Sequence, residues 1–435
     1  MLDELKSVAR KVSGERALRG LLIDCKRLLS ERGTANSVAI ARDLVARFDA
    51  LPDDARPAFF ERLARDFSPD PMAVLRGAQA YAAEPSADNL IRLTQLAEPP
   101  RQELLRRINR TPGGTASIVR MRRALLERLP RQPELLSLEA DLLHLLSSWF
   151  NPGFLQMRRV DWNSPAQLLE QIIRHEAVHS IDGWDDLRRR LQPDRRCFAF
   201  FHPQLPDEPL IFVEVALVPQ MPAAVAPLLD KASPPLPPER FKVATFYSIS
   251  NCQPGLKGVS LGNFLIKRVA EELKRELPQL KAFCTLSPMP GFAAWLSKNP
   301  ELDALPGLKR AAAERAAEAQ QTLHEACEGE WSRLAGVPAL EALSAPARGA
   351  LLTLGAVYLL HATHTPHGDP VARFHLDNGA RLERLNFMAN LARPGLRQSF
   401  GLMVNYLYDL GKVEAHHEAF VHGDVVHSRA VGSLL

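Results

Sequence analysis

Cysteine and long apolar runs are both scarce in this 435-residue chain. Five cysteines are spread along it without a C-x-x-C pair: Cys25, Cys197, Cys252, Cys284 and Cys327. This odd number and wide spacing argue against a disulfide framework or a cysteine-based zinc cluster, and favour a reducing compartment. No apolar run reaches the roughly 20 residues that cross a bilayer. The most apolar stretch, residues 349–362, is therefore predicted to be a buried helix.

A strong excess of charge is missing as well. Lys and Arg number 54 against 50 Asp and Glu, a net charge of +4, which argues against nucleic acid as the main partner. The first residues carry Asp3 and Glu4 and lack the apolar stretch of a secretory signal. The last residues, VGSLL, are not the S-K-L address. We therefore expect a cytoplasmic protein that does not associate with membranes.

One zinc-protease pattern is present but incomplete. Residues 175–179 read H-E-A-V-H, and on a helix two such histidines can share one Zn²⁺ while the glutamate activates water. The sequence favours a helix that has Ser164 as its N-cap, before Pro165, and runs through this pattern. No third ligand follows, and three arginines at 188–190 would put positive charge near a metal. We predict a helix end with solvated polar residues, no metal, and zinc protease as a remote alternative.

The remaining histidines of interest are irregularly spaced. We predict exposed loop and tail positions rather than metal ligands for this set: His361, His364, His367, His416, His417, His422 and His427.

The pattern of apolar residues predicts two regions of different class. Residues 1–158 contain eight segments with apolar residues at helical spacing, which predicts an all-helical bundle domain. In residues 159–435, β-branched and aromatic runs at 197–203, 209–218, 242–250 and 281–288 predict strands. An amphipathic helix is predicted over 260–277, and further helices follow. The predicted class is α+β.

A glycine-rich turn carries the most chemical information. Gly255, Gly258 and Gly262 lie between a predicted strand and a predicted helix, without a G-x-G-x-x-G or P-loop pattern. From Lys257 the chain reads K-G-V-S-L-G, close to the Q/R-x-x-G-x-G/A loop by which GNAT-type acetyltransferases hold the pyrophosphate of coenzyme A. Backbone N–H groups at a helix start can bind such an anion. A tight turn with glycines for packing is an equally open interpretation.

Longer segments around this turn resemble the malonyl-CoA decarboxylase family. The similarity lies in "EAVHSIDGWDDLRRRL", "RRCFAFFHPQLPDEPLIFVEVAL", "FYSIS…QPGLKGVSLGNFLIKRVAEELKRELPQLKAFCTLSPMPGF", "FHLDNGARLERLNFMAN" and "SFGLMVNYLYDL". The resemblance implies a helical assembly domain followed by a GNAT-like catalytic domain. It also implies conversion of malonyl-CoA to acetyl-CoA and CO₂ without metal or organic cofactor, in a homo-oligomer (dimer or tetramer).

The resemblance also implies roles for individual residues. Ser287 and His375 match the family's catalytic serine and histidine, and Ser248 and Tyr408 match polar residues that line the site. The CoA-phosphate loop would comprise Lys257, Gly258, Val259, Ser260, Leu261, Gly262 and Asn263. Ser260 replaces an acidic residue of some members, which leaves the role of that side chain open.

The proposed chemistry fits these residue types. Loss of CO₂ from a malonyl thioester leaves an enolate, whose oxygen needs a hydrogen-bond donor and whose carbon needs a proton. Ser287 could orient and polarise the malonyl group, and His375, with an ordinary pKa near neutrality, could donate the proton. Two other functions stay open. One is a GNAT-like acyltransferase that uses an acyl-CoA and an amine, and the other is a non-catalytic CoA-binding scaffold.

Overall fold

The chain packs as two compact units. The computed structural model describes residues 2–261 and 265–435, with side chains from residue 13 onward. Unit 1 combines the chain up to Gln156 with Phe201–Leu210 and Gln253–Leu261, and unit 2 contains the rest. The predicted domain boundary at residues 158 and 159 stays a prediction, since compact packing alone does not define a folding domain. Gly262 and Asn263 of the predicted loop lie outside the described residues.

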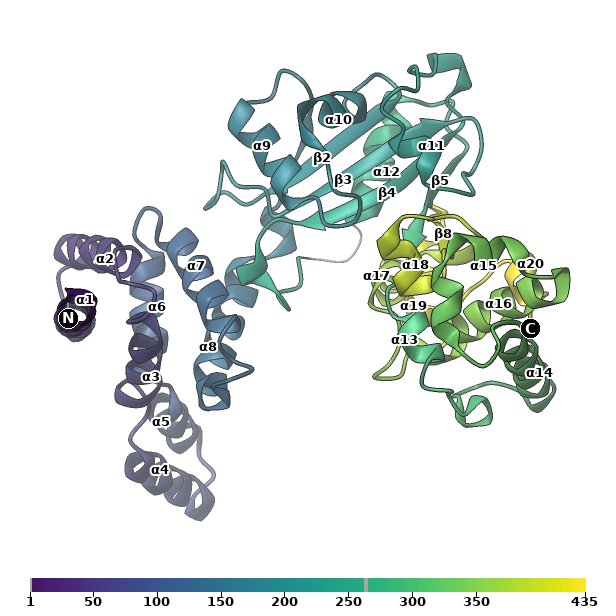
Figure 1. Cartoon of the computed structure of the whole chain (residues 1–435). Coiled ribbons are helices and arrows are strands. Elements are labelled where there is room, and N and C mark those ends of the chain that lie inside the picture. Colours follow the sequence, from purple (N-terminus) through teal and green to yellow (C-terminus); the bar gives the residue numbers. More distant parts are fainter. Residues whose placement is uncertain (1, 262–264) are drawn as a thin grey trace. The chain divides into compact units, whose positions relative to one another are not determined.

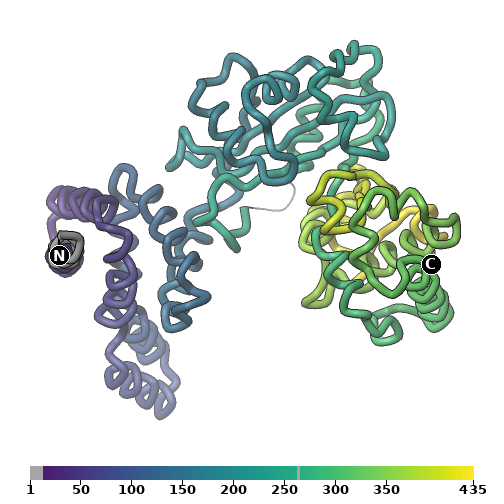
Figure 2. The backbone as a smooth tube through the Cα atoms, in the orientation of Figure 1, coloured from purple at the N-terminus to yellow at the C-terminus, as the bar shows by residue number. Residues whose placement is uncertain are grey.

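Unit 1 is helical, as its sequence predicts (Figures 1 and 2). Each of the eight predicted segments corresponds to one helix: α1 (Leu2–Ser30), α2 (Thr34–Asp49), α3 (Arg56–Asp66), α4 (Pro71–Ala83), α5 (Ala87–Ala97), α6 (Pro100–Asn109), α7 (Gly114–Leu126) and α8 (Leu136–Trp149). Three short 3₁₀ turns accompany them: η1 (Pro133–Leu135), η2 (Pro152–Phe154) and η4 (Pro254–Leu256).

Local sequence explains how these helices start and pack. The Asp70 carboxylate caps α4 by accepting the Met72 N–H at 2.9 Å, because the first N–H groups of a helix lack partners within it. Leu104 and Ile108 bury one face of α6. A buried ion pair of 2.6 Å joins Arg101 of α6 to Asp141 of α8. The helices are thus held together by apolar contacts and by a few shielded charges.

Unit 2 is built on a mixed eight-stranded sheet, ordered β1-β2-β3-β4-β5-β8-β6 with β7 also paired to β8. The strands are β1 (Gln156–Val160), β2 (Arg195–Phe201), β3 (Ile211–Val218), β4 (Val243–Asn251), β5 (Ala282–Thr285), β6 (Ser287–Pro288), β7 (Arg381–Asn386) and β8 (Met403–Leu407). From β2 to β8 all neighbours run antiparallel except β4 and β5, which are parallel. Every residue of β2 and β3 is buried, as their apolar sequences predict.

One crossover helix connects the two parallel strands. It is α12 (Leu265–Glu276), and its buried face carries Leu265, Ile266, Val269, Ala270 and Leu273. A parallel pair requires such a crossover, and the strand–turn–helix–strand order is the one that the glycine-rich turn predicts. The helix is shorter than the predicted range 260–277. The predicted strand 281–288 is divided at Leu286 into β5 and β6.

Further helices belong to unit 2. They are α9 (Ala166–His175), α10 (Gly183–Arg190), α11 (Ala226–Leu229), α13 (Phe292–Leu296), α14 (Arg310–Ala326), α15 (Val337–Ala342), α16 (Ala345–Val357), α17 (Pro370–Asp377), α18 (Arg393–Ser399), α19 (Val413–Val421) and α20 (Arg429–Gly432). Figure 1 shows α9 and α10 beside β2 and the group from α13 to α20 near β8. Shorter turns are η3 (Pro238–Arg240), η5 (Leu302–Ala304), η6 (Trp331–Ala335) and the π-helical η7 (Tyr358–Ala362).

The apolar stretch 349–362 lies in α16 and η7 and buries Leu351 and Leu354, as predicted. In the described part of the chain no helix is long and apolar enough to cross a membrane. The predicted α+β class, with an all-helical first part and a mixed sheet that carries helical additions, is confirmed.

Candidate functional site

Ser287 lies in the short strand β6 of unit 2. Its backbone pairs with Val404 of β8, and the residue as a whole is only 5% exposed. The Ser287 hydroxyl donates to Thr285 Oγ1 at 2.9 Å. Thr285 Oγ1 in turn accepts the Tyr406 N–H at 3.2 Å. The hydroxyl is therefore held by the sheet itself rather than by a mobile loop.

His375 reaches the same place from α17. Asp369 caps this helix through Val371 N–H and Ala372 N–H, at 2.9 and 3.0 Å. The imidazole stacks on the Tyr406 ring, with centroids 4.7 Å apart and planes 29° apart. These contacts fix both the helix and the ring that it carries.

The two predicted catalytic side chains are hydrogen-bonded to each other. Ser287 Oγ and His375 Nε2 are 2.9 Å apart, and His375 Nδ1 is 2.9 Å from the Tyr408 hydroxyl. Because Ser287 already donates to Thr285, the arrangement that satisfies every bond has His375 Nε2–H donating to Ser287 and Tyr408 O–H donating to Nδ1. The result is a continuous series of hydrogen bonds that runs from Tyr408 through His375 and Ser287 to Thr285.

Burial changes the electrostatic state of this chain. Loss of solvation lowers the pKa of His375 to about 3, and it raises the pKa of Tyr408 well above its usual value, because a low-polarity interior disfavours the charged forms. His375 is thus a neutral imidazole at pH 7. The expectation that its pKa lies near neutrality is wrong, since the sequence does not reveal that the ring is enclosed.

Ser248 is held by an acidic partner that the sequence analysis interpreted differently. Its hydroxyl lies 2.6 Å from Glu176 Oε2, and Ser250 Oγ lies 3.2 Å from the same oxygen. The other oxygen of Glu176 accepts the N–H groups of Val178 and His179, at 2.9 and 2.7 Å. One buried carboxylate therefore fastens the segment after α9 to the end of β4.

This arrangement corrects the account of the H-E-x-x-H pattern. The helix has Pro165 rather than Ser164 as its N-cap. It runs from Ala166 to His175, so His179 does not share a helical face with His175. The helix end is confirmed, but the polar residues are not solvated: Glu176 is 8% exposed and His179 is 7% exposed. Burial lowers the pKa of His179 to about 4. Among the described residues, no group of three His, Cys, Asp or Glu could hold a metal ion.

A cavity of 260 Å³ opens onto Ser287 and His375. Val178 and Ser248 contribute to its wall. The rest of the wall is mostly apolar: Ile211, Phe246, Tyr247, Ile249, Pro288, Pro370, Val371 and Phe374, with Asn251. Tyr408 is not in the wall and acts behind His375. A small, largely apolar cavity with a few convergent polar groups is the usual form of a ligand site.

The predicted CoA loop is described only from Lys257 to Leu261, in unit 1. Gly258 has φ +80°, a backbone conformation that side chains other than glycine rarely adopt. The N–H groups of Lys257 and Val259 bond within the loop, to Pro254 and Leu256. They are thus engaged, and a phosphate would need the other N–H groups of the predicted loop.

An arginine from the helical unit supports this loop. Arg122 of α7 donates to the carbonyls of Gly255 and Lys257, at 2.8 and 2.7 Å, and it pairs with Glu139 of α8. The sequence offers no signal for this role, because Arg122 and Lys257 are distant along the chain. Thr285 and Asp369 were also missed. A serine or threonine two residues before Ser287, and an aspartate before Pro370, could have suggested them.

The histidines predicted to be exposed are partly buried. His364, His367, His422 and His427 are exposed, whereas His361 and His417 are half-buried and His416 is buried. The predicted exposure is therefore wrong for His416. The predicted loop position is wrong for His361, which lies in η7, and for His416 and His417, which lie in α19. Partial burial lowers the pKa of His416.

Comparisons with known proteins agree over nearly the whole chain. Residues 67–150 match the model of the malonyl-CoA decarboxylase N-terminal domain, and residues 153–435 match that of the C-terminal domain. The mitochondrial malonyl-CoA decarboxylase of Mus musculus is 36% identical over 417 residues, covering 88% of this chain and 82% of that protein.

Solved structures show the same similarity. The malonyl-CoA decarboxylase of Rhodopseudomonas palustris superposes with a TM-score of 0.84 at 47% identity, over 96% of this chain and 99% of that one. The enzyme of Agrobacterium vitis gives 0.83 at 46% identity, over 95% and 99%.

Proposed function

Since this chain belongs to the malonyl-CoA decarboxylase family, we propose that it converts malonyl-CoA to acetyl-CoA and CO₂ at the cavity that contains Ser287 and His375. The observation that carries the proposal is the buried chain of hydrogen bonds from Tyr408 through His375 to Ser287. These are the residues at which the family resemblance implies catalysis.

In the proposed reaction Ser287 binds the malonyl group. Its hydroxyl lines the cavity from a fixed strand. When substrate binds, the O–H turns from Thr285 Oγ1 and donates to the thioester oxygen or to the carboxylate. Cleavage of the bond between the α-carbon and the carboxylate releases CO₂ and leaves its electron pair on the α-carbon and the thioester oxygen. The Ser287 hydroxyl, held on a strand and needing only this rotation, then stabilises the developing oxyanion by a hydrogen bond.

His375 then supplies the proton as a neutral imidazole. Nε2–H transfers its proton to the α-carbon while Tyr408 O–H donates to Nδ1, which leaves a tyrosinate that water reprotonates after product release. The thioester enolate is a much stronger base than a tyrosinate, so this transfer is downhill even for a buried tyrosine. A neutral histidine with a lowered pKa serves a similar role as electrophile in triosephosphate isomerase.

The binding of CoA phosphates by the loop from Lys257 to Asn263 is part of the proposal. Its support is the order of strand, turn and helix, the positive φ of Gly258 and the engagement of Arg122 with the loop carbonyls. We further propose that no metal or organic cofactor takes part, that the helical domain joins subunits into a homo-oligomer, and that the protein acts in the cytoplasm. Light scattering that gives a monomer mass at micromolar concentration would contradict the oligomer.

The deciding experiment supplies malonyl-CoA alone to the purified protein. A decarboxylase forms CO₂ and acetyl-CoA in equal amounts without any acceptor, and a chelator leaves the rate unchanged. An acyltransferase would require an added amine and would consume acyl-CoA without CO₂. A non-catalytic scaffold would bind CoA and form neither product.

A further inference from the structure

A second cavity lies in unit 2, apart from the residues around Ser287. Its volume is 540 Å³, within the usual range of small-molecule sites. Three segments form it: the loop before α14 with the first turns of that helix, the end of η7, and the chain after α19. No residue of its wall belongs to the wall of the first cavity.

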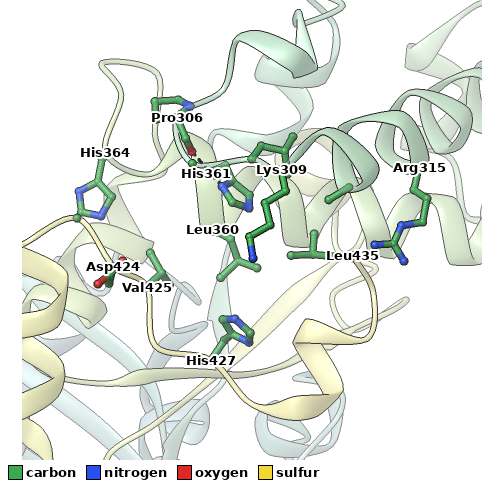
Figure 3. A pocket seen from close by; sticks show the side chains of 14 residues that line it. Pro306, Lys309, Arg315, Leu360, His361, His364, Asp424, Val425, His427 and Leu435 are labelled. Atoms are coloured by element: carbon green, nitrogen blue, oxygen red, sulfur yellow. Dashed lines mark hydrogen bonds between the residues drawn. The ribbon is translucent and has the colours of Figure 1, made fainter.

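Positive charge gathers on one side of this cavity. Lys309, Ala312 and Arg315 all line it. Lys309 is the N-cap of α14 and Arg315 lies in the second turn, about 9 Å further along the helix axis. Figure 3 shows the Lys309 side chain extending into the cavity. In the described part of the chain, neither cation lies within ion-pair distance of a carboxylate. By contrast, Arg310 on the adjacent face pairs with Glu314 at 3.0 Å.

The start of α14 adds further donors. Its N-cap, Lys309, makes no side-chain capping bond. The N–H groups of Ala312 and Ala313 bond to the Lys309 carbonyl, while those of Arg310 and Ala311 precede the first bond within the helix. A helix start combines such N–H groups with the positive end of the helix dipole and attracts anions. Here it coincides with a cavity and with two unpaired cations.

Histidines complete the wall. His361 Nδ1 is 3.0 Å from the Pro306 carbonyl, drawn in Figure 3, and His427 Nδ1 is 3.0 Å from the Ser428 carbonyl. Because a carbonyl only accepts, Nδ1 carries the proton in both rings. His364, Asp424 and Leu435, the last residue of this chain, also line the cavity.

We propose that this cavity is a second ligand site, which binds a small molecule bearing one or more phosphate groups through Lys309, Arg315 and the start of α14. Arginine binds phosphate oxygens with two parallel hydrogen bonds and lysine adds a point charge. The site is independent of the reaction at Ser287.

A bound anion should change the protonation of this wall. The charged and titratable groups that line the cavity are Lys309, Arg315, His361, His364, His427, Asp424 and the carboxylate of Leu435. Partial burial lowers the pKa of His361, and the charge of His427 lowers it further. A bound anion reverses this effect, since an opposite charge favours the protonated imidazole. A bound phosphate therefore raises the pKa of His361.

Calorimetric titration of the full chain with inorganic pyrophosphate, and with phosphate for comparison, tests the site. At pH 7.5 we expect saturable binding that weakens at least about tenfold in Lys309→Gln and in Arg315→Gln, the loss that one charge-assisted hydrogen bond gives. Arg310→Gln is the matched control, because it removes the same charge from the same helix on another face. Both substituted cations are exposed, so the variants should fold, as melting curves would verify.

Three outcomes would overturn the proposal. The first is the absence of saturable binding in the wild type. The second is unchanged binding when Lys309→Gln and Arg315→Gln are combined in one double variant, which would place the anion elsewhere, as at the CoA loop. The third is an equal loss of affinity in Arg310→Gln. It would mean that the anion responds to the general positive potential of the helix and not to a specific site.

Discussion

At the scale of single residues, the central feature is a histidine that burial keeps neutral. Ordinary histidine would gain and lose its proton near pH 6.5, yet enclosure lowers the pKa of His375 to about 3. The hydrogen bonds to Ser287 and Tyr408 remain available in this state. The proton donor must then be a neutral imidazole whose Nδ1 accepts a hydrogen bond from the Tyr408 hydroxyl.

The pH dependence of turnover distinguishes the two states. If His375 acted as an imidazolium of ordinary pKa, kcat would fall about tenfold per pH unit above pH 6.5. The neutral form exists throughout the range from pH 6 to 8, so we expect kcat to stay within about a factor of two over this range. A decline that titrates near pH 6.5 in the wild type would contradict the neutral imidazole.

Sequence could identify these residues but not their state. Ser287, His375 and Tyr408 are found through the family resemblance. They are distant in the sequence, but in the structure His375 forms a hydrogen bond of 2.9 Å with each of the other two. The pKa of His375 depends on what encloses it, which is a property of the assembled sheet and helices. For the same reason Glu176 was interpreted as a solvated residue, whereas it is buried against β4.

At the scale of elements, one carboxylate connects the two segments that carry the catalytic pair. Asp369 caps α17, which carries His375, and its second oxygen accepts the Gly291 N–H at 3.1 Å, four residues after Ser287. The residue is fully buried. Asp369 is therefore a positioning residue that acts through both segments.

Asp369→Asn should lower kcat by about 10–100-fold with little change in KM. The amide would direct an N–H group toward backbone N–H donors, and a displacement of about 1 Å can cost roughly 100-fold in rate. In a Ser287→Ala background the same exchange should cost much less, because the alignment no longer matters. Steady-state kinetics of the four proteins measure this.

Asp70→Asn is the control for that exchange, since Asp70 caps α4 in the other unit by the same kind of bond. An equal loss from Asp369→Asn in both backgrounds would mean that the residue supports the fold in general and not the alignment.

The CoA loop makes its own prediction at this scale. Gly258→Val should weaken CoA binding at least tenfold, because a branched side chain is strained at φ +80° and blocks the approach of phosphate to the backbone. Gly113→Val carries the same strain, at φ +77° in open space at the start of α7, and each exchange should lower stability by about 1–2 kcal/mol. Equal CoA affinity in the two variants would refute the loop assignment.

At the scale of the whole molecule, buried neutral histidines make stability depend on pH. The pKa values of His375 and His179 in the folded chain are about 3 and about 4, against about 6.5 in the unfolded chain. Above pH 6.5 both are neutral in either state. As pH falls below 6.5, these histidines bind protons in the unfolded chain but not in the folded chain. The free energy of unfolding therefore decreases by about 1.4 kcal/mol per pH unit for each of the two residues.

Urea unfolding at pH 7, 6 and 5 checks this. His179→Gln should lose less stability between pH 6.5 and 5 than the wild type, and His422→Gln, at an exposed position, should behave as the wild type. Parallel losses in all three proteins would show that His179 does not titrate as described.

The architecture itself was accessible from sequence to different extents. Helices α1–α8 follow from apolar spacing, and β2, β3 and β4 from their β-branched and aromatic runs. The order of the strands in the sheet was not accessible from the sequence, because pairings such as β5 with β8 join residues more than a hundred positions apart. The separation of β5 from β6, which sets the position of Ser287, depends on those pairings.

The central claim is that Ser287 and His375 act together in decarboxylation, and the turnover of malonyl-CoA by His375→Asn and Ser287→Ala tests it most directly. Asparagine keeps some hydrogen bonding but cannot supply the proton, and alanine removes the hydroxyl that stabilises the oxyanion. Each variant should lose roughly 100-fold or more in kcat while it still binds CoA, and the double variant should lose much less than the product of the two. Near wild-type release of CO₂ by His375→Asn, with the fold verified by circular dichroism, would contradict the account.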